Sequence, residues 1–462
     1  MNVLYLYNST QTYTATVFEH ISGFRKYSKY RSFFAHQDQY NNLNIDFTNF
    51  DAIVIHFTIR LPFDQIADGT ASALNEFKGL KVLFIQDEYD HTQRAWHWIR
   101  SLGIQLVFTV VPPDGIARVY PPQVFPEVRF VSVLTGYVPE NLHSASHIPP
   151  SQRPLVVGYR GRPLPIRYGE LGREKISIGE MVSQYCTRHD IAHDVAWTEE
   201  ARIYGPRWYE FMSSCRSILG SESGSNVFDW DGTLAAKIQE FKDKNPRADD
   251  SIVYSELIQS LEMSGLMNQV SPRVFEAIAA RTVLVLFEGS YSDVVMPDVH
   301  FIPLKKDGSN LENVFKLLAD GAYVDAMAEQ AYQDIIVSGR YSYNSFVRLV
   351  DEEIEISHKL LGQAPLVAPA NGSCLVHSVQ PTALTTSPLQ TIGSCISNSV
   401  QPTEHTTSVR PSELTTSPIQ ATATSPSSSR LRRIAIRLWA RLPESARVVI
   451  LQKLGRRPRG KG

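Results

Sequence analysis

The chain has 462 residues, 43% of them hydrophobic, and this length predicts two globular domains with additional segments, because it exceeds what one hydrophobic core usually organises. Its formal net charge of −2 is unevenly distributed, since residues 430–462 hold eleven Arg and Lys against a single Glu and leave the rest of the chain acidic. An acidic body argues against nucleic acid as a partner, and the basic end favours an anionic surface.

Residues 1–150 are predicted to form a doubly wound α/β domain. Short apolar runs that read as strands alternate with amphipathic stretches that read as helices. The strands are expected at 3–7, 52–57, 81–85, 104–110 and 129–133, and the helices at 17–24, 63–78 and 94–102. This alternation is typical of a parallel sheet covered by helices on both faces.

Residues 151–361 repeat the same pattern. Strands are expected at 155–157, near 195, and at 216–219, 282–287 and 300–304, with helices at 175–189, 208–214, 271–280, 310–318, 323–337 and 343–361. The sequence therefore predicts two consecutive Rossmann-like domains of the α/β class, whose ligands bind beyond the carboxyl ends of their strands.

The remaining residues differ in composition from both domains. Residues 362–429 are rich in Ser, Thr, Pro and Gln, which predicts a disordered linker. In residues 430–462, Ile434, Leu438 and Leu442 recur at helical spacing among arginines. This pattern predicts a basic amphipathic helix lying on an anionic membrane, with a helical tag for a partner protein as the alternative.

The sequence patterns predict neither disulfides nor a metal site, and neither export nor membrane insertion. The four cysteines form no CxxC pair and no set at zinc-ligand spacing, so neither a disulfide framework nor a structural metal is predicted. The N-terminus lacks a basic segment followed by an apolar stretch, and no uncharged apolar run reaches membrane-spanning length. We therefore expect a cytoplasmic protein that attaches peripherally to the inner face of the plasma membrane.

The first candidate binding segment is the turn GYRGR that follows the strand at 155–157. Glycines allow the backbone to approach a ligand closely, and arginines form charge-assisted bonds to diphosphate oxygens. The alternative is a structural turn with solvated arginines. The candidate binding residues are Gly158, Arg160, Gly161 and Arg162.

The second candidate segment is the polar loop LGSESGSNVFDWDG after the strand at 216–219. Glu222 stands where a nucleophile elbow requires its serine, which argues against an esterase. Asp229 and Asp231 form a DxD triplet that can hold a divalent cation, although loop or helix capping is the favoured reading and no metal is expected. The candidate binding residues of this loop are Ser221, Glu222, Ser223 and Gly224.

The third candidate segment opens the helix at 271–280. Ser271 suits the N-cap and Pro272 the first helical position, so Arg273 and Glu276 share a face near the helix N-terminus. Exposed N–H groups there favour an anion, and a carboxylate can accept two ribose hydroxyls. The alternative is a surface ion pair between the two side chains.

The run SPRVFEAIAARTVLVLFEG, followed by IPLKKDGSNLENV and YSYNSFVRLV, resembles the donor-binding half of the group 1 glycosyltransferases of the GT-B fold. The likeness is to a bacterial branch that also carries YRGR-type and ESGS-FDWDG-type segments. It spans about Gly158 to Val350 and continues weakly through FIQDEYD in the first domain. The resemblance implies that Glu276 holds the nucleotide ribose and that the glycine-rich turn contacts the diphosphate. Asn268 and Arg281 depart from the family, which usually has Glu and Gly there.

The resemblance implies a transferase that moves a sugar from a nucleotide-diphosphate sugar to a surface-glycan precursor, a glycolipid or a similar acceptor in polysaccharide biosynthesis. No cofactor besides the donor is expected. The first domain then holds the acceptor, and His56, Asp87 and Glu88 follow its strands as candidates for a general base. Two alternatives remain, a non-catalytic GT-B-like module that binds a nucleotide or glycan, and a nucleotide-sugar epimerase.

Overall fold

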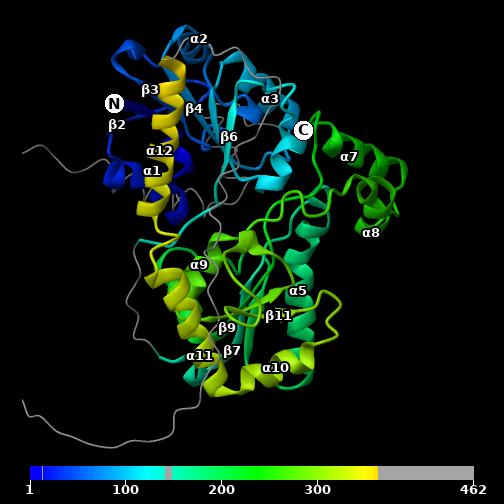
Figure 1. Cartoon of the computed structure of the whole chain (residues 1–462). Coiled ribbons are helices and arrows are strands. Elements are labelled where there is room, and N and C mark those ends of the chain that lie inside the picture. The colour runs from blue at the N-terminus through cyan, green and yellow to red at the C-terminus, as the bar shows by residue number, and fades with distance from the viewer. Residues whose placement is uncertain (13, 141–147, 363–462) are drawn as a thin grey trace, which may run out of the picture. The chain divides into compact units, whose positions relative to one another are not determined.

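The computed structural model describes residues 1–12, 14–140 and 148–362 (Figure 1). The predicted linker from 362 onward and the predicted basic helix at 430–462 lie outside these described residues, apart from Gly362 itself. None of the helices within these ranges has the length and apolar character needed to span a bilayer.

The first sheet is fully parallel, in the order β2-β1-β3-β4-β5-β6. Its inner strands β3 and β4 are buried along their whole length and, apart from Lys81, apolar, as a sheet covered by helices requires. The strands are β1 (Asn2–Tyr7), β2 (Arg31–His36), β3 (Ala52–Ile55), β4 (Leu80–Ile85), β5 (Leu106–Thr109) and β6 (Arg129–Ser132), and the helices are α1 (Ala15–Tyr27), α2 (Asp68–Glu76), α3 (Thr92–Ser101) and α4 (Ile116–Val119).

The second sheet is also fully parallel, in the order β11-β10-β9-β7-β8. The predicted α/β class, with two parallel sheets and their helices, is therefore confirmed. The strands are β7 (Leu155–Arg160), β8 (His193–Ala196), β9 (Cys215–Gly220), β10 (Val283–Phe287) and β11 (Phe301–Leu304), and the helices are α5 (Gly169–Arg188), α6 (Pro206–Ser214), α9 (Pro272–Ala279), α10 (Leu311–Ala319) and α11 (Gly321–Ala331).

Strand order reverses between β1 and β3 in the first sheet and between β7 and β9 in the second. At such a point the loops leaving adjacent strands diverge, which opens a crevice at the carboxyl ends of the strands. The two reversals therefore mark where ligands are expected.

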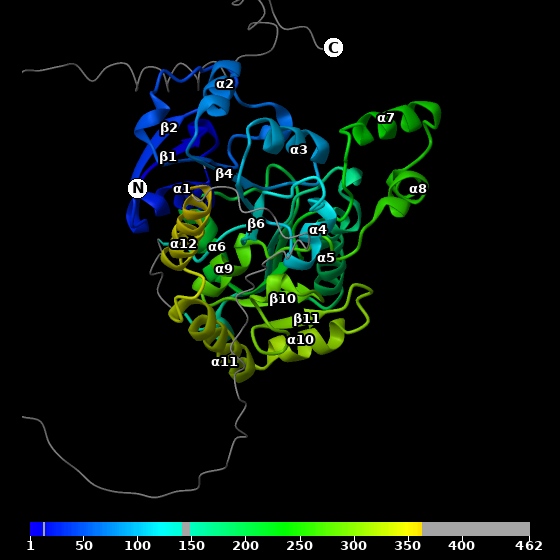
Figure 2. The ribbon, with the colours of Figure 1, turned by 45° about the horizontal axis from the view of Figure 1, so that its top comes forward.

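Between β9 and α9 the chain forms a helical insertion that the sequence patterns did not predict. It contains α7 (Leu234–Lys244) and α8 (Asp250–Val253), which are drawn close together in Figure 2. Asp229 accepts a bond from the amide of Leu234 at 3.2 Å, and Asp231 accepts one from the amide of Thr233 at 3.0 Å. The DxD triplet thus organises the start of α7, as the capping interpretation expected.

Helix α12 (Tyr343–Gly362) packs with the first sheet, although it follows the second in sequence. Both views show it beside α1 (Figures 1 and 2). Phe346 and Val347 enter the core of the first sheet. Arg129 forms a bidentate ion pair with Glu353, in which Nε donates to Oε2 at 2.6 Å and Nη2 donates to Oε1 at 3.1 Å. This placement differs from the sequence assignment, which grouped 343–361 with the second domain.

The FIQDEYD and FDWDG segments contact each other. Asp229 donates its amide to the carbonyl of Tyr89 at 2.8 Å, and Gln93 donates its amide to the carbonyl of Trp230 at 2.9 Å. Arg167, after β7, forms an ion pair with Asp90. These bonds hold the loops of the two sheets together at one edge of the site described next.

Candidate functional site

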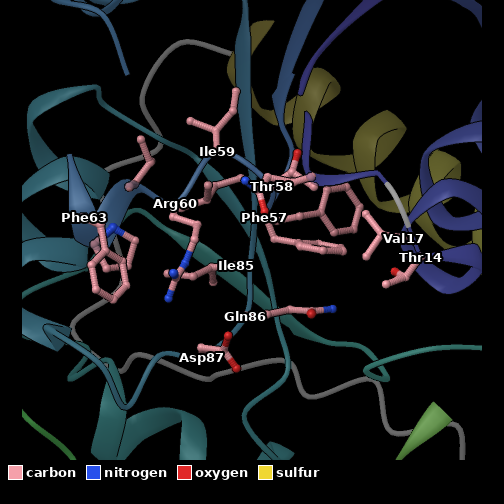
Figure 3. Close-up of a pocket in the computed structure, with 15 residues that line it drawn as sticks. Thr14, Val17, Phe57, Thr58, Ile59, Arg60, Phe63, Ile85, Gln86 and Asp87 are labelled. Atoms are coloured by element: carbon pink, nitrogen blue, oxygen red, sulfur yellow. The ribbon is translucent and has the colours of Figure 1, made fainter. Parts of the chain in front are cut away.

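Two adjoining cavities lie at the carboxyl ends of the strands. The larger has a volume of about 1160 Å³ and is lined by residues that follow strands of both sheets. The smaller, of about 240 Å³, is lined only by elements of the first sheet (Figure 3). The two share the lining residues Thr14, Val17, Gln86 and Asp87. The larger cavity is the candidate donor site, and the smaller one opens beside it.

Three cations line the larger cavity without an acidic partner. Within the described part of the chain, Arg162, Lys175 and Arg273 form no ion pair with a carboxylate. The guanidinium of Arg273 donates to the carbonyl of Arg160 and lies 5.4 Å from the centre of the Trp208 ring. Three positive charges around one cavity, none of them within ion-pair distance of a carboxylate in the described residues, favour a ligand that carries more than one negative charge.

Lys175 is a site residue that the sequence reasoning missed. Its ammonium donates to the carbonyl of Ser221 at 3.3 Å and to the carbonyl of Glu222. Burial, together with the nearby charge of Arg273, lowers the pKa of Lys175 to about 8. The available signal was its position on α5, where Leu171, Ile178 and Val182 form a buried stripe that a lysine interrupts.

Glu276 faces the larger cavity from the helix that the sequence predicted. Its Oε2 accepts a bond from the indole nitrogen of Trp208 at 2.8 Å, and burial raises the pKa of its carboxyl. Arg273 and Glu276 are not within ion-pair distance in the described structure, although the charge of Arg273 still lowers the pKa of the Glu276 carboxyl against the larger effect of burial. Ser271 occupies the N-cap position and lines the cavity, but its side chain makes no capping bond.

Gly158 and Arg160 of the GYRGR segment both have structural contacts, and Arg160 also lines the larger cavity. The side chain of Arg160 donates one bond to the carbonyl of Ala201 at 2.9 Å and another to Oδ2 of Asp194 at 2.7 Å. A Cβ on Gly158 would lie 2.4 Å from Sγ of Cys215, so this glycine permits strand and helix packing. Gly161 and Arg162 line the larger cavity as expected.

The SESG loop divides into a buried part and a cavity-lining part. Ser223 and Gly224 line the larger cavity, and Gly224 has a φ of +105°, where a Cβ would meet the carbonyl of Met267 at 2.1 Å. Ser221 and Glu222 are buried behind the loop and do not line it. Glu222 instead accepts bonds from the amide of Tyr291 at 2.8 Å and from the side chain of Asn268.

The departure at Asn268 has a local explanation. Its amide nitrogen donates to Oε2 of Glu222, and its amide oxygen accepts a bond from the side chain of Asn226 at 2.8 Å. Glu222 is 3% exposed, so a second carboxylate at 268 would face a buried like charge. Glu222 thus supplies the negative charge in this network, and the neutral Asn268 complements it.

We expect Asn268→Glu to destabilise the protein by several degrees in melting temperature, because it places two carboxylates together in a buried network. The double variant Glu222→Gln with Asn268→Glu should recover most of that loss, since it restores one charge and one amide. Thermal melting at neutral pH measures both. Equal melting of the single variant and the wild type would contradict this account.

Two of the three candidate bases lie away from both cavities. His56 is fully buried, with Nε2 at 2.9 Å from Nδ1 of His20 and Nδ1 at 3.0 Å from the hydroxyl of Thr58. Burial lowers the pKa of His56 well below its usual range. Glu88 is also fully buried; it accepts a bond from the hydroxyl of Thr109, and burial raises its pKa to about 7. These positions correct the expectation that His56 and Glu88 reach the cleft.

Asp87 lies where the two cavities meet. It lines both, is exposed, and accepts a bond from the hydroxyl of Tyr89 at 2.6 Å. Its φ of +59° is a left-handed conformation, which Asp and Asn adopt more readily than most residues other than glycine. Of the three candidate bases, Asp87 alone lines either cavity.

Metal ligation has no support in the described residues. Within 1–12, 14–140 and 148–362, no group of three or more His, Cys, Asp or Glu side chains is arranged to hold a metal ion.

No protein-family model matches the chain, and no curated protein matches it in sequence. Solved structures to which it is similar include an α-glucosyltransferase in complex with UDP and a 13-mer DNA, at 11% identity over 77% of this chain and 99% of that chain, with a TM-score of 0.44. Another is the T4 phage β-glucosyltransferase with UDP-glucose, at 13% identity over 78% of this chain and 100% of that chain, with a TM-score of 0.42. A third is Anabaena HepE with UDP, at 12% identity over 77% of this chain and 100% of that chain, with a TM-score of 0.43.

These similar structures are glycosyltransferases, the class that the sequence resemblance names. They also overturn one expectation. The charge distribution argued against nucleic acid as a partner, but two of the similar structures are glucosyltransferases in complex with DNA. The exclusion of nucleic acid is therefore wrong as a prediction from net charge.

Proposed function

We propose that this protein is a glycosyltransferase that takes a sugar from a nucleotide-diphosphate sugar and delivers it to a hydroxyl of an acceptor. The observation that carries the proposal is the larger cavity, which Arg162, Lys175 and Arg273 line from elements around the second sheet and Asp87 lines from the first. Cations from one part of the fold and a carboxylate from the other suit a reaction that releases an anion and a proton.

The donor is proposed to lie against the second sheet. Arg162, Lys175 and Arg273 bind the diphosphate, which also meets the N-terminus of α9, where unpaired N–H groups favour an anion. Glu276 accepts the ribose hydroxyls with the carboxylate oxygen that Trp208 does not use. The uncharged turn of Ser223 and Gly224 closes the space beside Lys175.

The reaction forms a bond between the acceptor oxygen and the anomeric carbon and breaks the bond from that carbon to the diphosphate oxygen. The diphosphate leaves with the electron pair, and the three cations stabilise its charge in the transition state. The sugar passes through an oxocarbenium-like state. Asp87 takes the proton of the acceptor hydroxyl, so the proposed displacement inverts the anomeric centre.

The acceptor is proposed to be a surface-glycan precursor or a glycolipid, which rests on the sequence resemblance. The test incubates the full chain with a panel of nucleotide sugars and separate acceptor pools of glycolipid, oligosaccharide and DNA. Mass spectrometry then detects a new glycosidic product. A bound nucleotide sugar that stays intact with every pool would favour the non-catalytic module, and conversion to an isomeric nucleotide sugar would favour the epimerase.

Binding of a nucleoside diphosphate is expected to weaken as pH rises above about 8, because Lys175 loses its proton there and then no longer attracts the phosphates. Below that pH the ammonium is charged and its full contribution is present. Calorimetric titration of UDP across this range measures the effect. Lys175→Arg is the matched control, since a guanidinium stays charged and should remove most of the pH dependence.

A further inference from the structure

The smaller cavity holds a cation that the proposed donor site does not use. Arg60 follows β3 and lines this cavity but not the larger one. Its guanidinium lies 3.9 Å from the centre of the Phe63 ring. Within the described residues, the guanidinium has no hydrogen bond and no ion pair, and Figure 3 shows its end pointing toward the side of the cavity where Asp87 lies.

The rest of the cavity wall is mainly apolar. Its apolar residues include Val17, Phe57 and Phe63, and the hydroxyl of Thr58 accepts a bond from the amide of Asn8 at 3.0 Å. Besides Arg60 and Thr58, the polar lining residues are Gln11, Thr14, Gln86 and Asp87. A half-buried guanidinium among apolar side chains is unfavourable unless an anion pairs with it. The wall therefore fits a ligand with a small apolar body and an acid group.

The anion that meets Arg60 is distinct from the donor diphosphate. The larger cavity has its own three cations on loops and helices of the second sheet, whereas every residue that lines the smaller cavity belongs to elements of the first sheet. Asp87 lies where the two cavities meet, so a molecule whose acid group pairs with Arg60 can present a hydroxyl to Asp87.

We propose that the acceptor is an acid-bearing molecule whose carboxylate or phosphate pairs with Arg60 while its apolar body fills the smaller cavity. This inference rests on the proposed function, because it assigns the acceptor of that reaction. Arg60 then determines acceptor specificity, and the planar guanidinium, held against Phe63, presents two parallel donors to the acid group.

The experiment titrates two probes of similar shape into the full chain, 4-hydroxybenzoate and the neutral 4-hydroxybenzyl alcohol, with binding followed by NMR. The wild type is expected to bind the anion about tenfold more tightly than the alcohol, which corresponds to one charge-assisted bond. Arg60→Gln should abolish this preference, and Arg60→Lys should retain only part of it, because an ammonium lacks the planar fork.

Arg94→Gln is the matched control, because Arg94 is an exposed arginine on α3 that pairs with Asp64 at 3.6 Å and lines neither cavity. It should keep the full preference. Equal binding of the two probes by the wild type, or a preference that survives in Arg60→Gln, would overturn the inference.

A parallel titration with UDP separates this inference from the proposed function. UDP binding without any preference for the acid probe keeps the proposed function and removes the inference. A preference that Arg60→Gln abolishes, in a protein that binds no UDP, supports the acid-binding cavity and removes the proposed donor site.

Discussion

Asp87→Asn is expected to lower the rate of sugar transfer by about a hundredfold or more while leaving UDP affinity unchanged, since loss of a general base typically costs about 10²–10⁴ in rate. The substitution suits the backbone, because Asn is one of the residues that tolerate the left-handed conformation of Asp87. Product formation at saturating donor measures the rate, and calorimetry measures the affinity.

Asp64→Asn is the control for this variant. Asp64 is also exposed, has a φ of +53°, and lines neither cavity. Its substitution should leave transfer within about twofold of the wild type, as is usual for surface changes of at most about 0.5 kcal/mol. Equal transfer rates in Asp87→Asn and Asp64→Asn would show that Asp87 is not the base.

Arg273→Ala is expected to weaken UDP binding by about tenfold or more and to leave uridine binding unchanged, because a charge-assisted bond contributes about 1.5–3 kcal/mol and uridine has no phosphate. Glu276→Gln should weaken uridine and UDP alike, since it removes the charge that meets the ribose. Measuring both ligands against both variants separates the phosphate contact from the ribose contact.

Arg173→Ala is the control for charge removal. Arg173 is exposed on α5, pairs with Glu170 at 3.1 Å, and does not line the larger cavity. It should bind both ligands like the wild type. If Arg273→Ala and Glu276→Gln also bind both ligands like the wild type, the proposed placement of the donor is wrong.

Most elements of the fold could be predicted because their patterns are strong. The uninterrupted apolar runs at 52–55 and 283–287 became buried inner strands, and the Ser-Pro start of 271–280 became α9. Strand β2 was missed because it is an edge strand whose Arg31 is exposed and whose other residues are only partly buried. Amphipathic periodicity shows that α12 has a buried face, but it does not show which sheet that face covers.

The sequence predicted some of the residues that line the cavities but not all of them, because it does not show in which direction each side chain points. The rule that ligands lie beyond strand ends correctly selected Arg162, Arg273 and Asp87 as residues that line the cavities. It failed for His56, because adjacent residues near a strand end point to opposite faces, and His56 points into packed protein. Arg160 does line the larger cavity, but its side-chain nitrogens donate to Asp194 and to the carbonyl of Ala201.

The return of α12 to the first sheet constrains how the chain folds during synthesis. Tyr343, Phe346, Val347, Val350 and Ile354 complete the core of that sheet, although its strands end at Ser132. All six strands of the first sheet are therefore synthesised long before α12, which packs on them. Part of the apolar surface of this sheet stays uncovered while the second sheet is synthesised. Such a surface is prone to aggregation until α12 emerges and covers it.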